Sequence, residues 1–213
     1  MNTTSIVLAG GRGSRLGKEK HTEEVAEESL IERTIGNLSL LSTEILIVIS
    51  NRQSKSNFSS YAEAKTVMDL YPGKGPLVGI YTGLVNSSNF HNLVVACDMP
   101  FLNLDLLRYM IDLSPGFDVI MPRIDEYKEP LHAVYTKNCL PSMESLIKGG
   151  SLKISDLLDS VSVRYVEKDE IDRFDPEHLS FFNINTKADL EKARLLASRD
   201  ITTGNHANRR HWK

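Results

Sequence analysis

The chain has 213 residues, a net charge of −3 at pH 7, and 41% hydrophobic residues. This length suits one sizeable α/β domain and is short for two. The charge gives no electrostatic case for a nucleic-acid partner, no stretch approaches the roughly 18 apolar residues of a membrane span, and the start lacks the features of a signal peptide. Two cysteines make no disulfide framework. We therefore expect a soluble cytoplasmic protein that binds neither nucleic acid nor membrane.

Strand-like and helix-like segments alternate along the chain. The expected strands are Ser5–Ala9, Ile45–Ile49, Thr66–Met68, Leu93–Cys97, Val119–Met121, Leu131–Tyr135 and Val161–Val166. The expected helices are Ser29–Leu41, Pro76–Val85, Leu104–Leu113, Lys137–Ile147 and Lys187–Ser198. This alternation predicts a three-layer α/β fold with a mostly parallel sheet and helices on both faces. We expect a single domain over residues 1–198 and a disordered tail over 199–213.

A glycine-rich, basic loop follows the first expected strand. Four glycines and four cations lie close together in it. Its residues are Gly10, Gly11, Arg12, Gly13, Ser14, Arg15, Leu16, Gly17, Lys18, Glu19 and Lys20. Glycine lets the backbone approach a ligand closely, so that successive N–H groups can converge on phosphate oxygens, and the cations can neutralise phosphate charge. The loop therefore predicts a nucleotide-phosphate site.

The spacing of this loop argues against two familiar alternatives. A P-loop would need glycine where Arg12 stands and a hydroxyl where Glu19 stands. A dinucleotide fingerprint would need its third glycine at Leu16, but Gly17 comes one residue late. A dehydrogenase that binds a dinucleotide remains the less favoured alternative.

Polar residues follow several expected strands, and ligands collect at the carboxyl ends of the strands in an open α/β sheet. Asp98 follows an entirely apolar strand, where it could hold Mg²⁺ against phosphate oxygens or cap the next helix. Asp69 and Asn51 could contact base or ribose, or could be ordinary turn residues. Gly75 belongs to a sharp strand-to-helix entry with room for a ligand.

Four blocks of the chain resemble known families. Residues 8–20 are similar to the nucleotidyltransferase signature Leu-Ala-Gly-Gly-x-x-x-Arg-Met-Gly-x-Asp-Lys, with leucine and glutamate in place of methionine and aspartate. The segments Cys97–Pro100, Glu129–Tyr135 and Phe182–Leu190 resemble blocks of the molybdenum cofactor guanylyltransferases. The four blocks keep the family order from Ile6 to about Ala193, which covers nearly the whole chain before the tail.

This resemblance implies a Rossmann-like nucleotidyltransferase fold, with a nucleotide-binding part over about 1–115 and an acceptor-binding part over about 116–198. It implies nucleotide contacts at Leu8, Ala9, Gly10, Gly11, Arg12, Gly13, Ser14, Lys20, Asn51, Asp69, Gly75 and Asp98. Asp98 would hold Mg²⁺, or Mn²⁺ in its place. The catalytic residues would be Arg15, Lys20 and Asp98.

The pterin contacts that the resemblance implies are Asn183, Asn185 and His132. The two asparagines would share one face of a strand, where their amides could read a polar ring edge, although the pair could also be structural. His132, between Leu131 and Ala133, is more typical of a packed residue than of a catalyst.

The implied reaction is Mg²⁺-dependent transfer of GMP from GTP to the terminal phosphate of molybdopterin, with or without molybdenum. Transient contacts with cofactor-insertion and acceptor proteins would accompany it. A cytidylyltransferase, a sugar-phosphate or other small-molecule nucleotidyltransferase, and a non-catalytic nucleotide-binding regulator are the alternatives. The acidic stretch of residues 23–28 departs from the family pattern, and we expect it on the solvent side.

Overall fold

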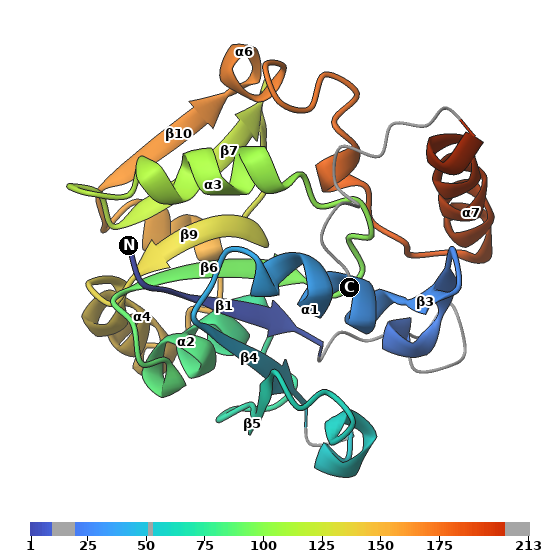
Figure 1. Cartoon of the computed structure of the whole chain (residues 1–213). Helices are drawn as coiled ribbons and strands as arrows, with labels where there is room; N and C mark the ends of the chain where they lie inside the picture. Colours follow the sequence, from blue (N-terminus) through green and yellow to red (C-terminus); the bar gives the residue numbers. More distant parts are fainter. Residues whose placement is uncertain (10–19, 51–52, 203–213) are drawn as a thin grey trace.

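The computed structural model describes residues 1–9, 20–50 and 53–202. Its centre is one eight-stranded sheet with the order β10-β7-β9-β6-β1-β4-β5, and β8 pairs with β7 (Figure 1). The strands are β1 Thr3–Leu8, β4 Glu44–Ile49, β5 Lys65–Met68, β6 His91–Ala96, β7 Val119–Ile124, β8 Tyr127–Lys128, β9 His132–Thr136 and β10 Val163–Glu167. All neighbours are parallel except β9, which runs antiparallel to β6 and β7, and β8, which is antiparallel to β7.

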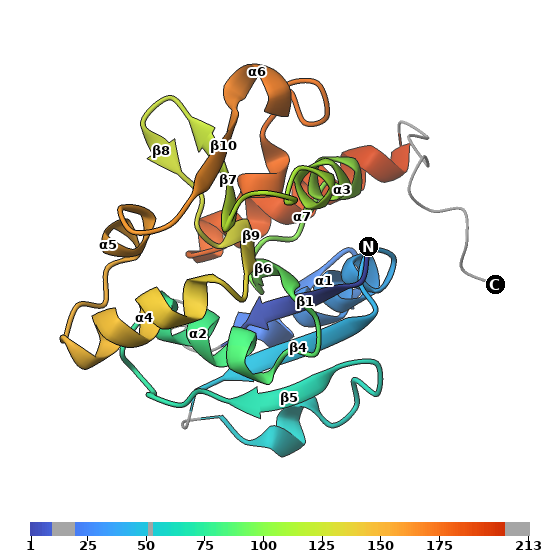
Figure 2. The same ribbon diagram turned by 90° about the vertical axis from the view of Figure 1, so that its left-hand side faces the viewer.

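Helices cover both faces of this sheet. They are α1 Leu30–Ser39, α2 Pro76–Asn86, α3 Leu104–Asp112, α4 Cys139–Lys148, α5 Ile154–Leu158, α6 Lys168–Ile171 and α7 Lys187–Thr202, with short 3₁₀ turns η1 Lys20–Thr22, η2 Lys55–Phe58 and η3 Leu179–Phe181. Figure 2 shows α1 and α3 on one side of the sheet and α2 and α4 on the other. No helix in the described ranges is both long and apolar enough to span a bilayer.

The inner strands are buried on both faces, which explains their continuous apolar sequences. Along β1, Val7 packs into the core on the α1 and α3 side, while Ile6 packs into the core on the α2 and α4 side. Val95 and Val94 of β6 divide in the same way. The predicted three-layer, mostly parallel fold is confirmed, and each expected strand and helix has its counterpart.

Helix α2 lies unusually close to β1. A Cβ atom added to Gly83 would stand 2.5 Å from Cγ2 of Ile6, far inside van der Waals contact. Glycine is therefore required here by the close approach of helix and strand rather than by backbone conformation.

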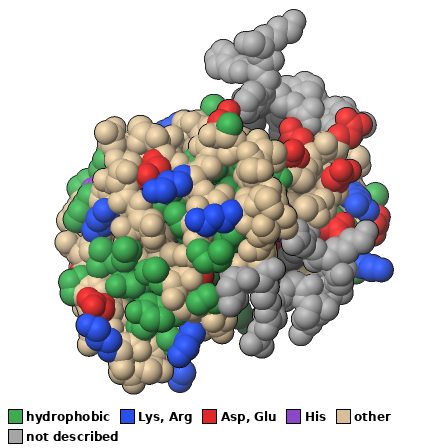
Figure 3. Space-filling model, turned by 90° about the horizontal axis from the view of Figure 1, so that it is seen from below, with side chains coloured by type: hydrophobic (Ala, Val, Ile, Leu, Met, Phe, Trp, Pro, Cys, Tyr) green, Lys and Arg blue, Asp and Glu red, His purple; other side chains and the backbone are tan. Residues whose placement is uncertain are grey.

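The edge strand β5 carries an exposed lysine, Lys65, and is only four residues long. Short length and charge are devices that discourage pairing of an open edge with another chain. Figure 3 shows the face that includes this edge, where basic and hydrophobic side chains are interspersed. The exposed apolar residues of this part of the chain include Met68, Leu70 and Tyr71.

The acidic stretch after Lys20 forms a hairpin that the sequence analysis did not predict, from β2 Glu24–Val25 and β3 Glu28–Ser29. Its two turn residues, Ala26 and Glu27, both have positive φ, at 53° and 68°. Such values at both central positions are typical of a type I′ turn, the two-residue connection whose twist suits a hairpin. The glutamates at 24, 27 and 28 are exposed, so their expected position on the solvent side is confirmed.

The hairpin and α7 share a third, smaller core. Its buried members are Val25, Leu30, Ile184, Leu190, Ala193 and Ala197. The Arg194 side chain adds a hydrogen bond from Nε to the carbonyl oxygen of Glu24 at 3.1 Å. Figure 1 shows α7 beside β3, at the opposite end of the chain.

Helix α7 continues to Thr202, four residues past the predicted end at Ser198. Residues 199–202 are therefore helical and do not belong to a disordered tail. The chain has no glycine or proline between Ser198 and Gly204 that would end the helix earlier. The remainder of the predicted tail, 203–213, lies outside the described residues.

Candidate active site

The carboxyl ends of β4, β1 and β6 meet at one edge of the sheet (Figure 1). After β1 the chain continues to β4 and β5 on one side, and then returns to place β6 on the other side of β1. The crevice beside β1 is thus a topological switch point, the usual position of a ligand in an open α/β sheet.

The end of β1 is anchored to the end of β4. Ala9 N–H donates to the carbonyl of Val48 at 3.0 Å, and the Gln53 side-chain amide donates to the Ala9 carbonyl at 3.1 Å. Gln53 Oε1 also accepts from Ser50 N–H at 3.1 Å. Ala9 is buried and Leu8 is half-buried. This anchoring fixes the point from which the glycine-rich loop starts.

Much of the predicted nucleotide and catalytic set lies outside the described residues. This holds for Gly10, Gly11, Arg12, Gly13, Ser14, Arg15 and Asn51. For Lys20 only the backbone is described, at the start of η1.

Asp98 follows β6 and lies between the end of β1 and the segment that leads to α7. Cys97 N–H, one residue before it, donates to the carbonyl of Leu8 at 3.3 Å. The Asp98 carbonyl accepts from Ile184 N–H at 3.0 Å, and Asp98 is half-buried. Hydrogen bonds therefore join three parts of the chain that the sequence analysis singled out separately: residues 8–9, Asp98 and the segment 183–185.

Asp69 takes part in the turn after β5. Its Oδ1 accepts from the Thr82 hydroxyl and from Tyr71 N–H, each at 3.1 Å. The sequence allowed Asp69 to be either a turn residue or a ligand contact, and these hydrogen bonds correspond to the turn role. Gly75, with φ of 96°, is the last residue before α2, and a Cβ there would enter open space.

Asn183 and Asn185 do not lie on a strand, so that expectation is wrong. They flank the fully buried Ile184 in a segment without regular secondary structure. The Ile184 N–H is bonded to the Asp98 loop rather than to a strand, and the start of α7 follows at once, with Thr186 N–H donating to Asp189 Oδ2 at 2.7 Å. Asn183 is half-buried and donates to the Phe181 carbonyl at 3.0 Å, while Asn185 is exposed.

His132 is fully buried in β9 and offers no surface to a ligand in this structure. Its Nε2 lies 2.7 Å from Ser180 Oγ, and its ring centroid lies 4.7 Å from that of Phe181. Burial lowers the pKa of His132 to about 4, so the ring is neutral near pH 7. This geometry fits the packed role that the sequence favours for His132.

Glu129 is a residue of this edge that the sequence analysis did not single out. Its N–H donates to Pro122 at 3.1 Å, in continuation of the β7–β8 ladder, and its carbonyl accepts from His132 N–H at 3.1 Å. The chain thus bulges between β8 and β9, directly beside the end of β6, where Ala96 N–H donates to Leu131 at 3.0 Å. Bulges near active sites commonly redirect a side chain.

The Glu129 carboxylate is half-buried, and its burial raises the pKa of the group. Among the described residues it makes no ion pair. The sequence marks Glu129 only as an acidic residue before the Pro-Leu-His segment. Its position at this edge of the sheet results from the bulge, which the sequence does not reveal.

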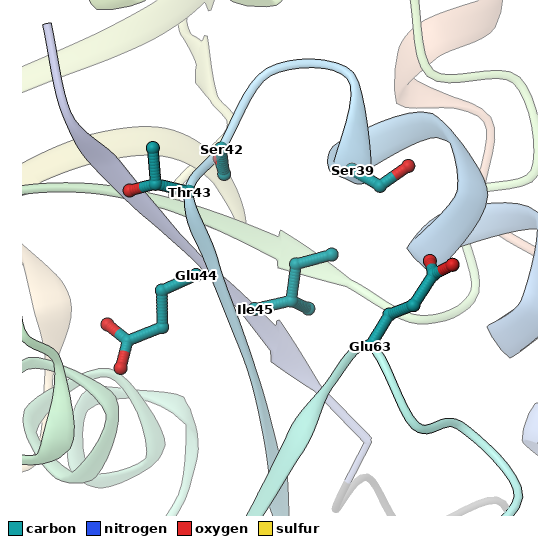
Figure 4. A pocket seen from close by; sticks show the side chains of 6 residues that line it. All are labelled: Ser39, Ser42, Thr43, Glu44, Ile45 and Glu63. Atoms are coloured by element: carbon teal, nitrogen blue, oxygen red, sulfur yellow. The ribbon is translucent and has the colours of Figure 1, made fainter.

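A small pocket opens near the amino end of β4, at the opposite edge of the sheet (Figure 4). It is lined by Ser39, Ser42, Thr43, Glu44, Ile45 and Glu63. Glu44 there accepts from the Thr4 hydroxyl at 2.6 Å and from Ser88 N–H at 2.8 Å. These bonds tie β1, β4 and the end of α2 together, so we interpret Glu44 as structural.

Residues 5–164 match the MobA-like NTP transferase domain family. A protein from Pelotomaculum thermopropionicum named probable molybdenum cofactor guanylyltransferase is 37% identical over 202 residues, which cover 95% of this chain and 97% of that protein. A protein of the same name from Methanosarcina mazei is 36% identical, with 88% of each chain covered.

Solved structures give the same picture. The crystal structure of molybdopterin-guanine dinucleotide biosynthesis protein A from Archaeoglobus fulgidus superposes with a TM-score of 0.81 at 32% identity, covering 92% of this chain and 99% of that one. A nucleotidyltransferase from Methanothermobacter, at 20% identity and a TM-score of 0.72, shares the fold.

Proposed function

Because the chain belongs to the MobA-like NTP transferase family and is thus a nucleotidyltransferase, we propose that it transfers GMP from GTP to the terminal phosphate of molybdopterin. The products are the guanine dinucleotide form of the cofactor and pyrophosphate. The observation that carries this proposal is the meeting of the β1 end, Asp98 and the Asn183–Asn185 segment through two backbone hydrogen bonds.

Asp98 is the residue that would hold a divalent metal. Mg²⁺, or Mn²⁺ in its place, takes one or two carboxylates and completes its coordination with substrate phosphates and water. The described part of the chain contains no group of three or more His, Cys, Asp or Glu side chains placed to bind a metal, which fits an ion held largely by substrate. When bound, such an ion supplies charge stabilisation at the reacting phosphates.

The nucleotide occupies the β1 and β4 side of the crevice in this proposal. Backbone N–H groups of the glycine-rich loop would bind the phosphates, and Arg15 and Lys20 would neutralise charge on the α-phosphate and on the leaving pyrophosphate. This is electrostatic and positional catalysis. The fixed positions of Ala9 and Gln53 support it, since they hold the start of that loop.

The acceptor phosphate needs no protein base. A phosphomonoester has its second pKa near ~6 and is largely dianionic at neutral pH. One of its oxygens attacks the α-phosphorus of GTP in line, the new P–O bond forms, and the bond to the bridging oxygen of pyrophosphate breaks. The buried and neutral His132 is consistent with a mechanism that requires no histidine base.

Pyrophosphate release with GTP and molybdopterin, in the presence of Mg²⁺, tests the proposal. We expect Lys20→Ala and Asp98→Asn each to lower kcat by about 10²–10³-fold, the size of a lost transition-state contact. Thermal unfolding of both variants is the control, because their melting temperatures should stay close to that of the wild type. Preferential use of CTP, or near-normal turnover by Lys20→Ala, would contradict the proposal.

A further inference from the structure

A connected network of buried polar groups lies behind the candidate active site. It joins His132 on β9, Ser180 in η3, Asp175 before η3, and Asn103 in the turn that leads into α3. His132 and Ser180 have no exposed surface, and Asp175 is 6% exposed. Buried polar groups persist when they are hydrogen-bonded, and such networks then rigidify the elements that they join.

Ser180 is the centre of this network. Its Oγ lies 2.7 Å from His132 Nε2 and accepts from Asn103 N–H at 2.9 Å. Its own N–H donates to Asp175 Oδ2 at 2.8 Å, while the neighbouring Leu179 N–H donates to Oδ1 at 3.0 Å. One hydroxyl thus links a central strand, the loop after β6 and the segment before α7.

The network ends at two residues of the candidate site. Asn103 closes the loop that begins at Asp98. On the other side, the Phe181 ring packs against His132, and the Phe181 carbonyl accepts from the Asn183 amide at 3.0 Å. The bond of 3.0 Å between Ile184 N–H and the Asp98 carbonyl then closes the circuit. The bonds around Ser180 therefore hold in place the two segments that the Ile184–Asp98 bond joins directly.

The imidazole of His132 suits this role in its neutral form. A protonated ring would need an acceptor at both nitrogens, and in the described structure Nδ1 has no hydrogen-bond partner. The contact with Ser180 therefore stays the same across the neutral pH range.

We propose that His132 is a positioning residue which, through Ser180, holds the Asn183–Asn185 segment against the Asp98 loop and so sets the affinity for the acceptor without touching it. Apart from the metal held by Asp98, the nucleotide contacts on the β1 and β4 side lie outside this network. The identity of the acceptor rests on the proposed function, but the positioning role does not.

The decisive variants are His132→Leu and Ser180→Ala, which remove the bond from either side. We expect each to raise KM for molybdopterin about tenfold, equivalent to about 1.4 kcal/mol, while the calorimetric Kd for GTP, measured without a divalent metal, stays unchanged. His132→Gln, whose amide can reach Ser180, should restore a near-normal KM. Thr136→Val, a change of similar volume at a buried position of the same strand, is the matched control and should behave as wild type.

Hydrogen exchange of the Ile184 amide gives a readout that needs no substrate. We expect faster exchange in His132→Leu and Ser180→Ala, and wild-type protection in His132→Gln and Thr136→Val. Unchanged protection of Ile184 in folded Ser180→Ala would overturn the positioning role, as would an equal loss of GTP and acceptor affinity. If the wild type fails to use molybdopterin while the exchange pattern holds, only the proposed function fails.

Discussion

Burial disfavours the charged forms of two titratable side chains near the active edge. His132 is enclosed between Ser180 and Phe181, and Glu129 is half-buried on the bulge that precedes β9. Burial disfavours the charged form of either group, so it lowers the pKa of the histidine and raises that of the carboxyl. Both shifts make the stability of the protein depend on pH, in opposite directions.

The free energy of unfolding should fall as the pH is lowered through the range from about 6.5 to about 4. In this window His132 binds a proton in the unfolded chain but not in the folded one, since its folded pKa is about 4. The full effect is roughly 3 kcal/mol, at about 1.36 kcal/mol for each pKa unit. Urea unfolding at several pH values measures it. His132→Gln should lack this part of the slope, and an identical slope in the two proteins would contradict the assignment.

Glu129→Gln should stabilise the protein slightly at pH 7. Burial raises the pKa of Glu129 in the folded protein above its value in the unfolded chain. As the pH rises above the unfolded pKa, ionisation of this carboxyl therefore lowers the free energy of unfolding. Glutamine does not ionise, so the variant avoids this loss. The gain should disappear below pH ~4.3, where the carboxyl is protonated in both states. Partial exposure keeps the effect small. Urea unfolding of both proteins at pH 7 and at low pH checks this, and a larger gain at low pH would refute it.

At this scale the sequence located Asp98 and Asp69 because each ends a strand, and strand ends meet at one edge of a parallel sheet. The sequence favoured a packed role for His132, which its burial agrees with, but it could not show what the side chain packs against. The environment of that side chain is made by Ser180 and Phe181, 48 and 49 residues further along the chain, and no local pattern encodes such a contact.

The close packing of helix α2 on strand β1 depends on Gly83, which has no side chain. Gly83→Ala would place a methyl group 2.5 Å from Ile6, which is fully buried in a central strand and has little room to move. We expect a loss of about 1–3 kcal/mol, typical of overpacking. Thermal or urea unfolding measures it.

Gly79→Ala is the matched control on the same helix. Its Cβ would lie 3.4 Å from Leu8 Cδ2, an ordinary contact. Since alanine favours a helix over glycine by up to about 1 kcal/mol, this variant should be neutral or more stable. Equal destabilisation by the two substitutions would mean that the close approach of α2 to β1 is not the cause.

Elements were predictable where their patterns were long. The apolar strands and amphipathic helices repeat their period over several residues, whereas β2, β3 and β8 have two residues each. The absence of strand pairing at residues 183–185 also escaped prediction, because alternation between polar and apolar residues does not reveal whether a segment has a strand partner.

At the scale of the whole molecule, α7 closes the structure over the hairpin. Ala193→Asp would bury an unpaired charge among Val25, Leu30 and Ile184, and we expect it to cost about 3 kcal/mol or more. Leu195→Asp, on an exposed position of the same helix, should change stability by less than about 0.5 kcal/mol. Urea unfolding separates the two, and similar losses in both would show that α7 does not pack as described.

The third core also determines when the hairpin can become buried during synthesis of the chain. Val25 and Leu30 belong to the first part of the chain to be made, but the other four buried members of their core lie between positions 184 and 197. Because domains generally fold as units, this core is completed only after those residues have been made. The hairpin, and the bond from Ile184 to Asp98, must wait for the last helix. A ribosome-bound chain that ends at residue 183 therefore contains every described strand of the central sheet but lacks Ile184 and α7, which complete the active edge.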